Sequence, residues 1–194
     1  MGRGRRIEIQ TGAIIAGAMA LLMVPLSFLF SFLIAAFVHE LCHYLVLSLT
    51  GSRIYRVSVG MFGASMETDF MDTGRGVLCA LAGPVGSFLT VACYRFMPEI
   101  ALCALIQGCF NLLPIYPLDG GRVLKGILEL LKIPEGEKVL AIIQWMTGAA
   151  LCAICLYGYL RWKLGLGVLF LGLMVLLRTL PRKTPCKDRP FGVQ

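Results

Sequence analysis

Residues 26–50 read LSFLFSFLIAAFVHELCHYLVLSLT, and this stretch decides the fold expected of the chain. It is long and apolar enough for a membrane-spanning helix, which needs about 20 residues. Its second half carries the polar cluster His39-Glu40-Leu41-Cys42-His43. Because ionisable side chains inside a membrane helix are energetically costly, such a cluster indicates a functional site.

The whole chain shares this apolar character. Of its 194 residues, 58% are hydrophobic and 15% are charged, whereas an ordinary soluble domain has about 25% charged residues. This composition excludes a soluble enzyme, a disordered chain and a secreted disulfide scaffold. The predicted fold class is therefore an all-α polytopic membrane protein.

Six apolar segments have the length of a membrane span or nearly so. They are about 9–24, 26–50, 76–97, 100–116, 139–160 and 164–180. Pro25 is expected to separate the first two, because proline interrupts a continuous helix. A signal peptide cleaved after Ala18-Met19-Ala20 is the alternative for the N-terminus, but the apolar run continues past that site.

The basic residues predict the orientation in the membrane. If the N-terminus is cytoplasmic, all but three of the 18 Lys and Arg residues lie on the cytoplasmic side, the exceptions being Arg95, Arg161 and Lys163. Since Lys and Arg are enriched in cytoplasmic loops, both termini are predicted to be cytoplasmic. The same topology explains the net charge of +7 without a nucleic-acid partner.

Two segments between the spans have patterns of their own. Residues 53–62, RIYRVSVGMF, alternate as a strand does and predict a small membrane-associated β-hairpin after the second helix. Residues 120–131 predict an amphipathic helix. We expect one membrane-embedded domain over 1–181, with a catalytic core at about 26–125, and a short basic cytoplasmic tail at 182–194.

The cluster in the second span has the pattern H-E-x-x-H, and the chain contains only 2 histidines. His39 and His43 are about one helical turn apart, so both imidazoles project from one face and can bind one zinc ion. Glu40 is expected to act as general base toward the attacking water and then as proton donor to the leaving amine.

A catalytic zinc usually has three protein ligands, and the third must come from elsewhere. Glu67, Asp69 and Asp72 lie in a polar loop, where solvated acids are expected. Asp119 follows Asn111-Leu112-Leu113-Pro114-Ile115-Tyr116-Pro117-Leu118, whose prolines cannot continue a regular helix. Such non-helical backbone at membrane depth is tolerated around a cavity, although Asp119 is also a plausible helix-terminus residue. Cys152 and Cys155 are expected to pack in a helix core.

The segments HELCH and NLLPIYPLDGGRVL together resemble the site-2 protease family of intramembrane zinc metalloproteases, most closely the stage IV sporulation protein FB branch. Ala82-Gly83-Pro84 matches a third, weaker family element. The resemblance covers about residues 26–125. The chain departs from the family at Cys42, where Gly is usual, and at Ser87, where Asn is frequent.

The resemblance implies specific roles for five residues. His39, His43 and Asp119 would bind one Zn²⁺ per chain, Glu40 would be catalytic, and Asn111 would hold the substrate or the developing oxyanion. The implied activity is that of a zinc-dependent metalloendopeptidase that cleaves a membrane-embedded or membrane-associated protein, in regulated intramembrane proteolysis that releases a factor such as a transcription factor.

The expected location is the bacterial cytoplasmic membrane, as an integral multi-pass protein. The expected partners are the lipid bilayer, a protein substrate with a transmembrane or membrane-adjacent segment, and a regulatory membrane protein. Two alternatives belong to other classes: a metal transporter, and a membrane protein that binds clients without cutting them. A transporter would usually offer several metal-binding side chains along a path.

Overall fold

The computed structural model describes residues 6–9, 25–51, 54–60, 63–68 and 72–162, together with isolated residues or pairs outside these ranges. The chain divides into two compact units. The first comprises the described residues up to Phe110, and the second comprises those from Asn111 onward. Within the described residues, three helices are long and apolar enough to cross a membrane: Leu26–Leu49, Thr73–Arg95 and Gly136–Arg161.

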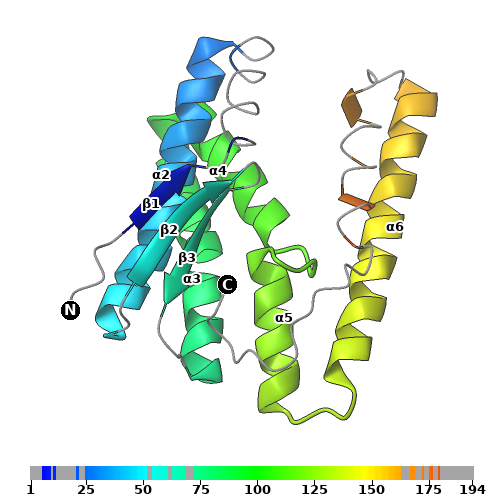
Figure 1. Cartoon of the computed structure of the whole chain (residues 1–194). Helices are drawn as coiled ribbons and strands as arrows, with labels where there is room; N and C mark the ends of the chain where they lie inside the picture. The colour runs from blue at the N-terminus through cyan, green and yellow to red at the C-terminus, as the bar shows by residue number, and fades with distance from the viewer. Residues whose placement is uncertain are drawn as a thin grey trace. The chain divides into compact units, whose positions relative to one another are not determined.

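The first unit is built on helices α2 (Leu26–Leu49) and α3 (Thr73–Val91), which pack side by side (Figure 1). The buried residues of α2 recur every fourth position and form one stripe, consisting of Ser31, Ala35, His39, His43 and Leu47. Since residues four apart lie on one helical face, this stripe is the side of α2 that packs inside the unit. The expected span 26–50 is therefore confirmed as a single helix.

Helix α3 buries mostly small residues, namely Gly76, Cys79, Ala80, Gly83, Pro84, Gly86 and Ser87. Small side chains allow two membrane helices to approach closely. The approach is close at Gly86, where a β-carbon would overlap the Sγ atom of Cys42 on α2. The span expected at 76–97 is thus present as α3, continued by a short 3₁₀ helix, η1 (Ala92–Arg95).

Three strands form one sheet in the order β1-β2-β3, seen in Figure 1 beside the labels of α2 and α3. Strand β2 (Ile54–Gly60) pairs antiparallel with β3 (Gly63–Thr68), with an irregularity in register between Ile54 and Arg56. Strand β1 (Arg6–Ile9) pairs parallel with β2. The alternation at 53–62 predicted β2, but β1 was not expected. The pairing of β1 with β2 joins segments that are far apart in the sequence, and local periodicity does not reveal such a pairing.

Helix α4 (Pro98–Asn111) is shorter than the span expected at 100–116. Its 14 residues extend about 21 Å, less than the roughly 30 Å of a bilayer core. The helix ends where the segment with Pro114 and Pro117 begins, as the break in helical pattern indicated. The spans expected at 9–24 and 164–180 lie largely outside the described residues, so the six-span layout stays a prediction.

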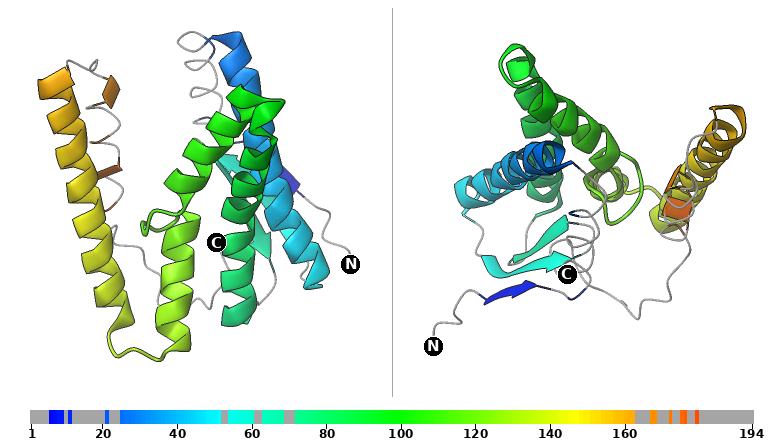
Figure 2. Two further views of the ribbon diagram at one scale, coloured as in Figure 1. Left: turned by 180° about the vertical axis from the view of Figure 1, so that it is seen from behind. Right: turned by 90° about the horizontal axis from the view of Figure 1, so that it is seen from above.

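The second unit contains helices α5 (Asp119–Leu130) and α6 (Gly136–Trp162), which contact each other (Figure 2). Helix α5 confirms the helix expected at 120–131, and α6 contains the span expected at 139–160. Before α5, a hydrophobic cluster of Ile115, Leu118 and Val175 anchors the loop that follows α4. The loop is therefore packed through its apolar side chains against Val175 and Leu151 of the same unit.

Candidate metal centre

His39 and His43 lie on the buried stripe of α2, and their side chains are 2% and 7% exposed. Their Nε2 atoms face each other at 3.3 Å, and the ring planes are inclined by 80°. This arrangement follows from the four-residue spacing, which brings both rings to the same face of one rigid helix. The two imidazoles predicted to act together are thus held together by α2 alone.

Helix α3 supplies a hydrogen-bond partner for the other nitrogen of each ring. The Nδ1–H of His43 donates to the backbone carbonyl of Cys79 at 2.7 Å. Nδ1 of His39 is hydrogen bonded to the hydroxyl of Ser87 at 2.9 Å. Metal-ligating histidines usually use their second nitrogen in this way, which fixes the orientation of the ring.

The geometry of the histidine pair fits a zinc ion. Two nitrogens that bind one tetrahedral zinc, each at about 2.0–2.1 Å, lie about 3.3–3.4 Å apart. The Nε2 atoms of His39 and His43 are separated by 3.3 Å. The residues present therefore suit the metal that the H-E-x-x-H pattern predicted.

Gly83 of α3 keeps the space in front of the two imidazoles open. A β-carbon at this position would lie 2.6 Å from Nε2 of His39 and still closer to Nε2 of His43. Any other residue would therefore place its β-carbon against the Nε2 atoms that would bind a metal. This explains, in physical terms, why the Ala82-Gly83-Pro84 segment belongs to the site.

Asp119 is the first residue of α5, and its side chain is 7% exposed. The backbone loop before it packs directly against the start of the helix. A β-carbon at Gly120 would overlap the backbone carbonyl of Leu112, and one at Gly121 would overlap the backbone nitrogen of Tyr116. The two glycines therefore let α5 begin close to its preceding loop, and this packing fixes the backbone position of Asp119.

The other expected residues of the site have these positions. Glu40 lies next to His39 on α2 and is partly buried, and Asn111 is the last residue of α4, also partly buried. His39 and His43 are buried together in the first unit, and Asp119 is buried in the second. The set of three ligands expected from the sequence stays a prediction.

Among the residues that the structure describes, no other acidic or thiol group belongs to a candidate metal-ligating group. Asp72 is exposed just before α3, as expected for a solvated acid, and Asp69 lies outside the described residues. Cys155 packs against Gly172, in agreement with the expected packing role. Sequence reasoning missed Ser87 and the carbonyl of Cys79 as partners of the histidines. The signals were that both flank the Ala82-Gly83-Pro84 element and that Ser87 stands where Asn is frequent in the family that the chain resembles.

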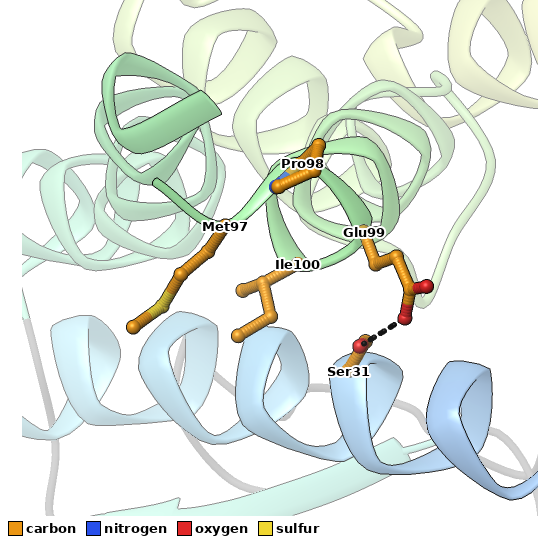
Figure 3. Close-up of a pocket in the computed structure, with 5 residues that line it drawn as sticks. All are labelled: Ser31, Met97, Pro98, Glu99 and Ile100. Atoms are coloured by element: carbon orange, nitrogen blue, oxygen red, sulfur yellow. Dashed lines mark hydrogen bonds between the residues drawn. The ribbon is translucent and has the colours of Figure 1, made fainter. Parts of the chain in front are cut away.

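A polar contact away from the histidines joins two helices of the first unit. The hydroxyl of Ser31 on α2 donates to Oε2 of Glu99 on α4 at 3.2 Å, within a pocket that Met97, Pro98 and Ile100 also line (Figure 3). Ser31 precedes His39 by eight residues, or about 12 Å along the helix. The contact therefore joins the start of α4 to α2 and is separate from the metal centre.

Comparison with known proteins finds similarity to zinc metalloproteases. Residues 70–155 match the sequence profile of peptidase family M50. The chain is 30% identical over 110 residues to a zinc metalloprotease of Methanocaldococcus jannaschii, an alignment that covers 50% of this chain and 32% of that protein. The chain spans about a third of the length of the curated relatives it matches.

A solved structure of a site-2 protease from Methanocaldococcus jannaschii has a similar fold. The similarity covers 96% of this chain and 97% of that one, with a TM-score of 0.64 and 22% sequence identity. At this identity the likeness concerns the fold alone. The fold of this chain is thus similar to that of a solved site-2 protease, and residues 70–155 match the profile of peptidase family M50.

Proposed function

We propose that this chain is a member of peptidase family M50 and acts as an intramembrane zinc metalloendopeptidase. The observation that carries the proposal is the histidine pair on an apolar helix of membrane-spanning length. His39 and His43 are buried, and their Nε2 atoms are 3.3 Å apart. This spacing suits a shared zinc ion. A merely structural pair would be a costly choice inside a membrane helix.

His39, His43 and Asp119 are the proposed ligands of one zinc per chain. When bound, zinc lowers the pKa of water and polarises a carbonyl group. Glu40, adjacent to His39 on α2, accepts the proton of the attacking water and later protonates the leaving amine. Asn111, at the end of α4, would hold the substrate or the developing oxyanion, a role that the family resemblance implies.

The substrate proposed is a protein with a helix in or beside the membrane. A helix keeps its peptide groups in internal hydrogen bonds, so the substrate must unwind locally before its carbonyl can be attacked. Cleavage near the cytoplasmic side would release a cytoplasmic product such as a transcription factor. A regulatory membrane protein that controls access is a further partner of this kind of proteolysis.

Within the site-2 protease family, we propose that the chain belongs to the stage IV sporulation protein FB branch and has a role in sporulation. Its support is the pattern of elements: an H-E-x-x-H helix followed by the strand pair β2 and β3. We further propose one membrane-embedded domain over 1–181 with a basic tail at 182–194, in a bacterial cytoplasmic membrane. Both termini would be cytoplasmic, because that orientation places most Lys and Arg on the cytoplasmic side.

Two variants test the proposed chemistry. In Glu40→Gln the ligands remain, so purified protein should retain one zinc per chain, while membrane-protein fragments found by N-terminal proteomics in cells producing the parent chain should disappear. In Asp119→Ala the zinc content should fall, with Asp72→Ala as a matched control that keeps it. Fragments that persist with Glu40→Gln, or a folded parent that binds no zinc, would overturn the proposal.

A metal transporter remains the rival from another class. It predicts zinc uptake into proteoliposomes that contain the purified chain. The protease hypothesis predicts no uptake above that of empty vesicles, because the candidate ligands are one set and do not line a path across the membrane. A client-binding scaffold predicts that Glu40→Gln changes nothing.

A further inference from the structure

We propose that Ser87 is a positioning residue that holds the imidazole of His39 in the orientation and tautomer needed for zinc binding. Its hydroxyl oxygen would accept the Nδ1–H of His39, which leaves the lone pair of Nε2 directed toward the metal. The inference rests on the proposed zinc site. It means that α3 orients an imidazole of the site, although this helix contributes none of the proposed ligands.

The burial of Ser87 makes its hydrogen bond important. The side chain is 0% exposed, and its hydroxyl is 2.9 Å from Nδ1 of His39, 48 residues away in the sequence. A helical serine often bonds to the carbonyl four residues earlier. Thr90, on the same helix, does this by donating to the carbonyl of Gly86 at 2.9 Å. Ser87 instead joins α3 to the metal-binding face of α2.

The hydrogen bond between His43 and the carbonyl of Cys79 shows how an acceptor at Nδ1 fixes the tautomer of the ring. A backbone carbonyl only accepts hydrogen bonds, so the bond to Cys79 requires the proton of His43 to be on Nδ1. Its Nε2 is then left with a lone pair for a metal. A hydroxyl both donates and accepts, so Ser87 can receive the Nδ1–H of His39 in the same way. Both rings then present Nε2 to one ion.

The surroundings of Ser87 hold its hydroxyl in place. On the neighbouring helix α4, a β-carbon at Gly108 would lie 3.0 Å from the β-carbon of Ser87. The two helices therefore meet closely at this point, and Ser87 has little room to move away from His39. A larger side chain would strain this contact, whereas alanine removes only the hydroxyl oxygen.

The first test measures zinc retention by the purified full-length chain in detergent, using competition with a chelator. Ser87→Ala should weaken zinc binding by about 10- to 100-fold, the usual effect of removing a hydrogen-bond partner of a metal-ligating histidine. Thr90→Ala removes a hydroxyl from the same helix and should match the parent. Ser87→Cys is a second variant that keeps the volume but offers a poor acceptor, and it should also bind zinc more weakly.

The second test reads the histidine rings directly. Because the chain has only 2 histidines, a spectrum of protein labelled with ¹⁵N-histidine contains signals from His39 and His43 alone. In zinc-loaded parent, the Nδ1–H of both rings should be protected from exchange with water. Ser87→Ala should speed exchange at His39 and leave His43 unchanged, which a general loosening of the fold would not do.

The zinc-free spectrum separates failure of this inference from failure of the proposed function. Even if the parent binds no zinc, Ser87→Ala should shift the ring nitrogens of His39 while Thr90→Ala should not. Unchanged His39 signals in Ser87→Ala, or zinc binding equal to that of the parent, would overturn the positioning role.

Discussion

At the scale of single residues, the candidate metal centre depends on the glycine at position 83 as much as on His39 and His43. The Nε2 atoms of His39 and His43 lie where a β-carbon at Gly83 would be. Ser87 and the carbonyl of Cys79 contact the opposite side of the rings. The Nδ1 atom of each imidazole therefore has a partner on α3, as is usual for metal-ligating histidines.

This arrangement predicts the effect of a single methyl group. In Gly83→Ala, the new β-carbon would lie within 2.6 Å of Nε2 of His39, so the rings would have to turn or the helices separate. We expect loss of zinc from the purified protein, measured as metal content per chain. Gly74→Ala is the matched control on α3, because its β-carbon would approach only the end of the Asp72 side chain, at 3.3 Å. Full zinc content in Gly83→Ala would contradict this account of the site.

At the scale of elements, the site depends on how closely α3 approaches α2. The stripe of buried residues on α2 meets a helix rich in glycine and alanine. Without a hydrophobic driving force between helices in lipid, close packing of small residues is what stabilises such a pair. Cys42 fits against α3 because Gly86 opposite it has no side chain.

The contact between Cys42 and Gly86 predicts a compensating pair of substitutions. Gly86→Ala should destabilise the protein by about 1–3 kcal/mol, the usual effect of overpacking. Adding Cys42→Gly should restore part of that loss, because it removes the Sγ atom that the new methyl group would overlap. The measurement is the thermal unfolding of the single and double variants in the same detergent. Strictly additive losses in the double variant would show that these two side chains do not compete for the same space.

At the scale of the whole molecule, the surface is that of a protein surrounded by lipid. Large apolar side chains are exposed along the membrane-length helices, among them Phe37 at 67%, Met146 at 68% and Leu160 at 69%. A soluble protein rarely exposes so many apolar groups together. The basic residues, in contrast, concentrate in the segments expected to lie at the cytoplasmic side.

This charge distribution predicts where the chain ends lie. A green fluorescent protein fused to either terminus should fluoresce in bacterial cells, because both ends would be cytoplasmic, and alkaline phosphatase fused to either terminus should be inactive. A phosphatase fusion placed after Lys163, in the loop expected outside, is the positive control. An active phosphatase at one terminus would mean an odd number of spans and would contradict the six-span prediction.

The sequence by itself determined the elements whose causes are local. Apolar runs of membrane length predicted α2, α3 and α6, and alternation predicted β2. The spacing of His39 and His43 predicted one shared face, because four residues make about one turn of any helix. The prolines after Asn111 predicted a break in regular helix before Asp119, but α4 ends at Asn111, earlier than the span expected at 100–116. Each of these follows from residues that are neighbours in the chain.

The tertiary structure alone decided which distant residues meet. The periodicity of the sequence does not indicate that β1 pairs with β2 or that Ser87 is hydrogen bonded to His39. Nor does it indicate that Gly83 lies next to the two imidazoles in space. These contacts depend on the rotation and separation of α2 and α3, which the packing of small side chains sets. The sequence therefore contains the chemical groups of the site, while the helix packing determines their orientation.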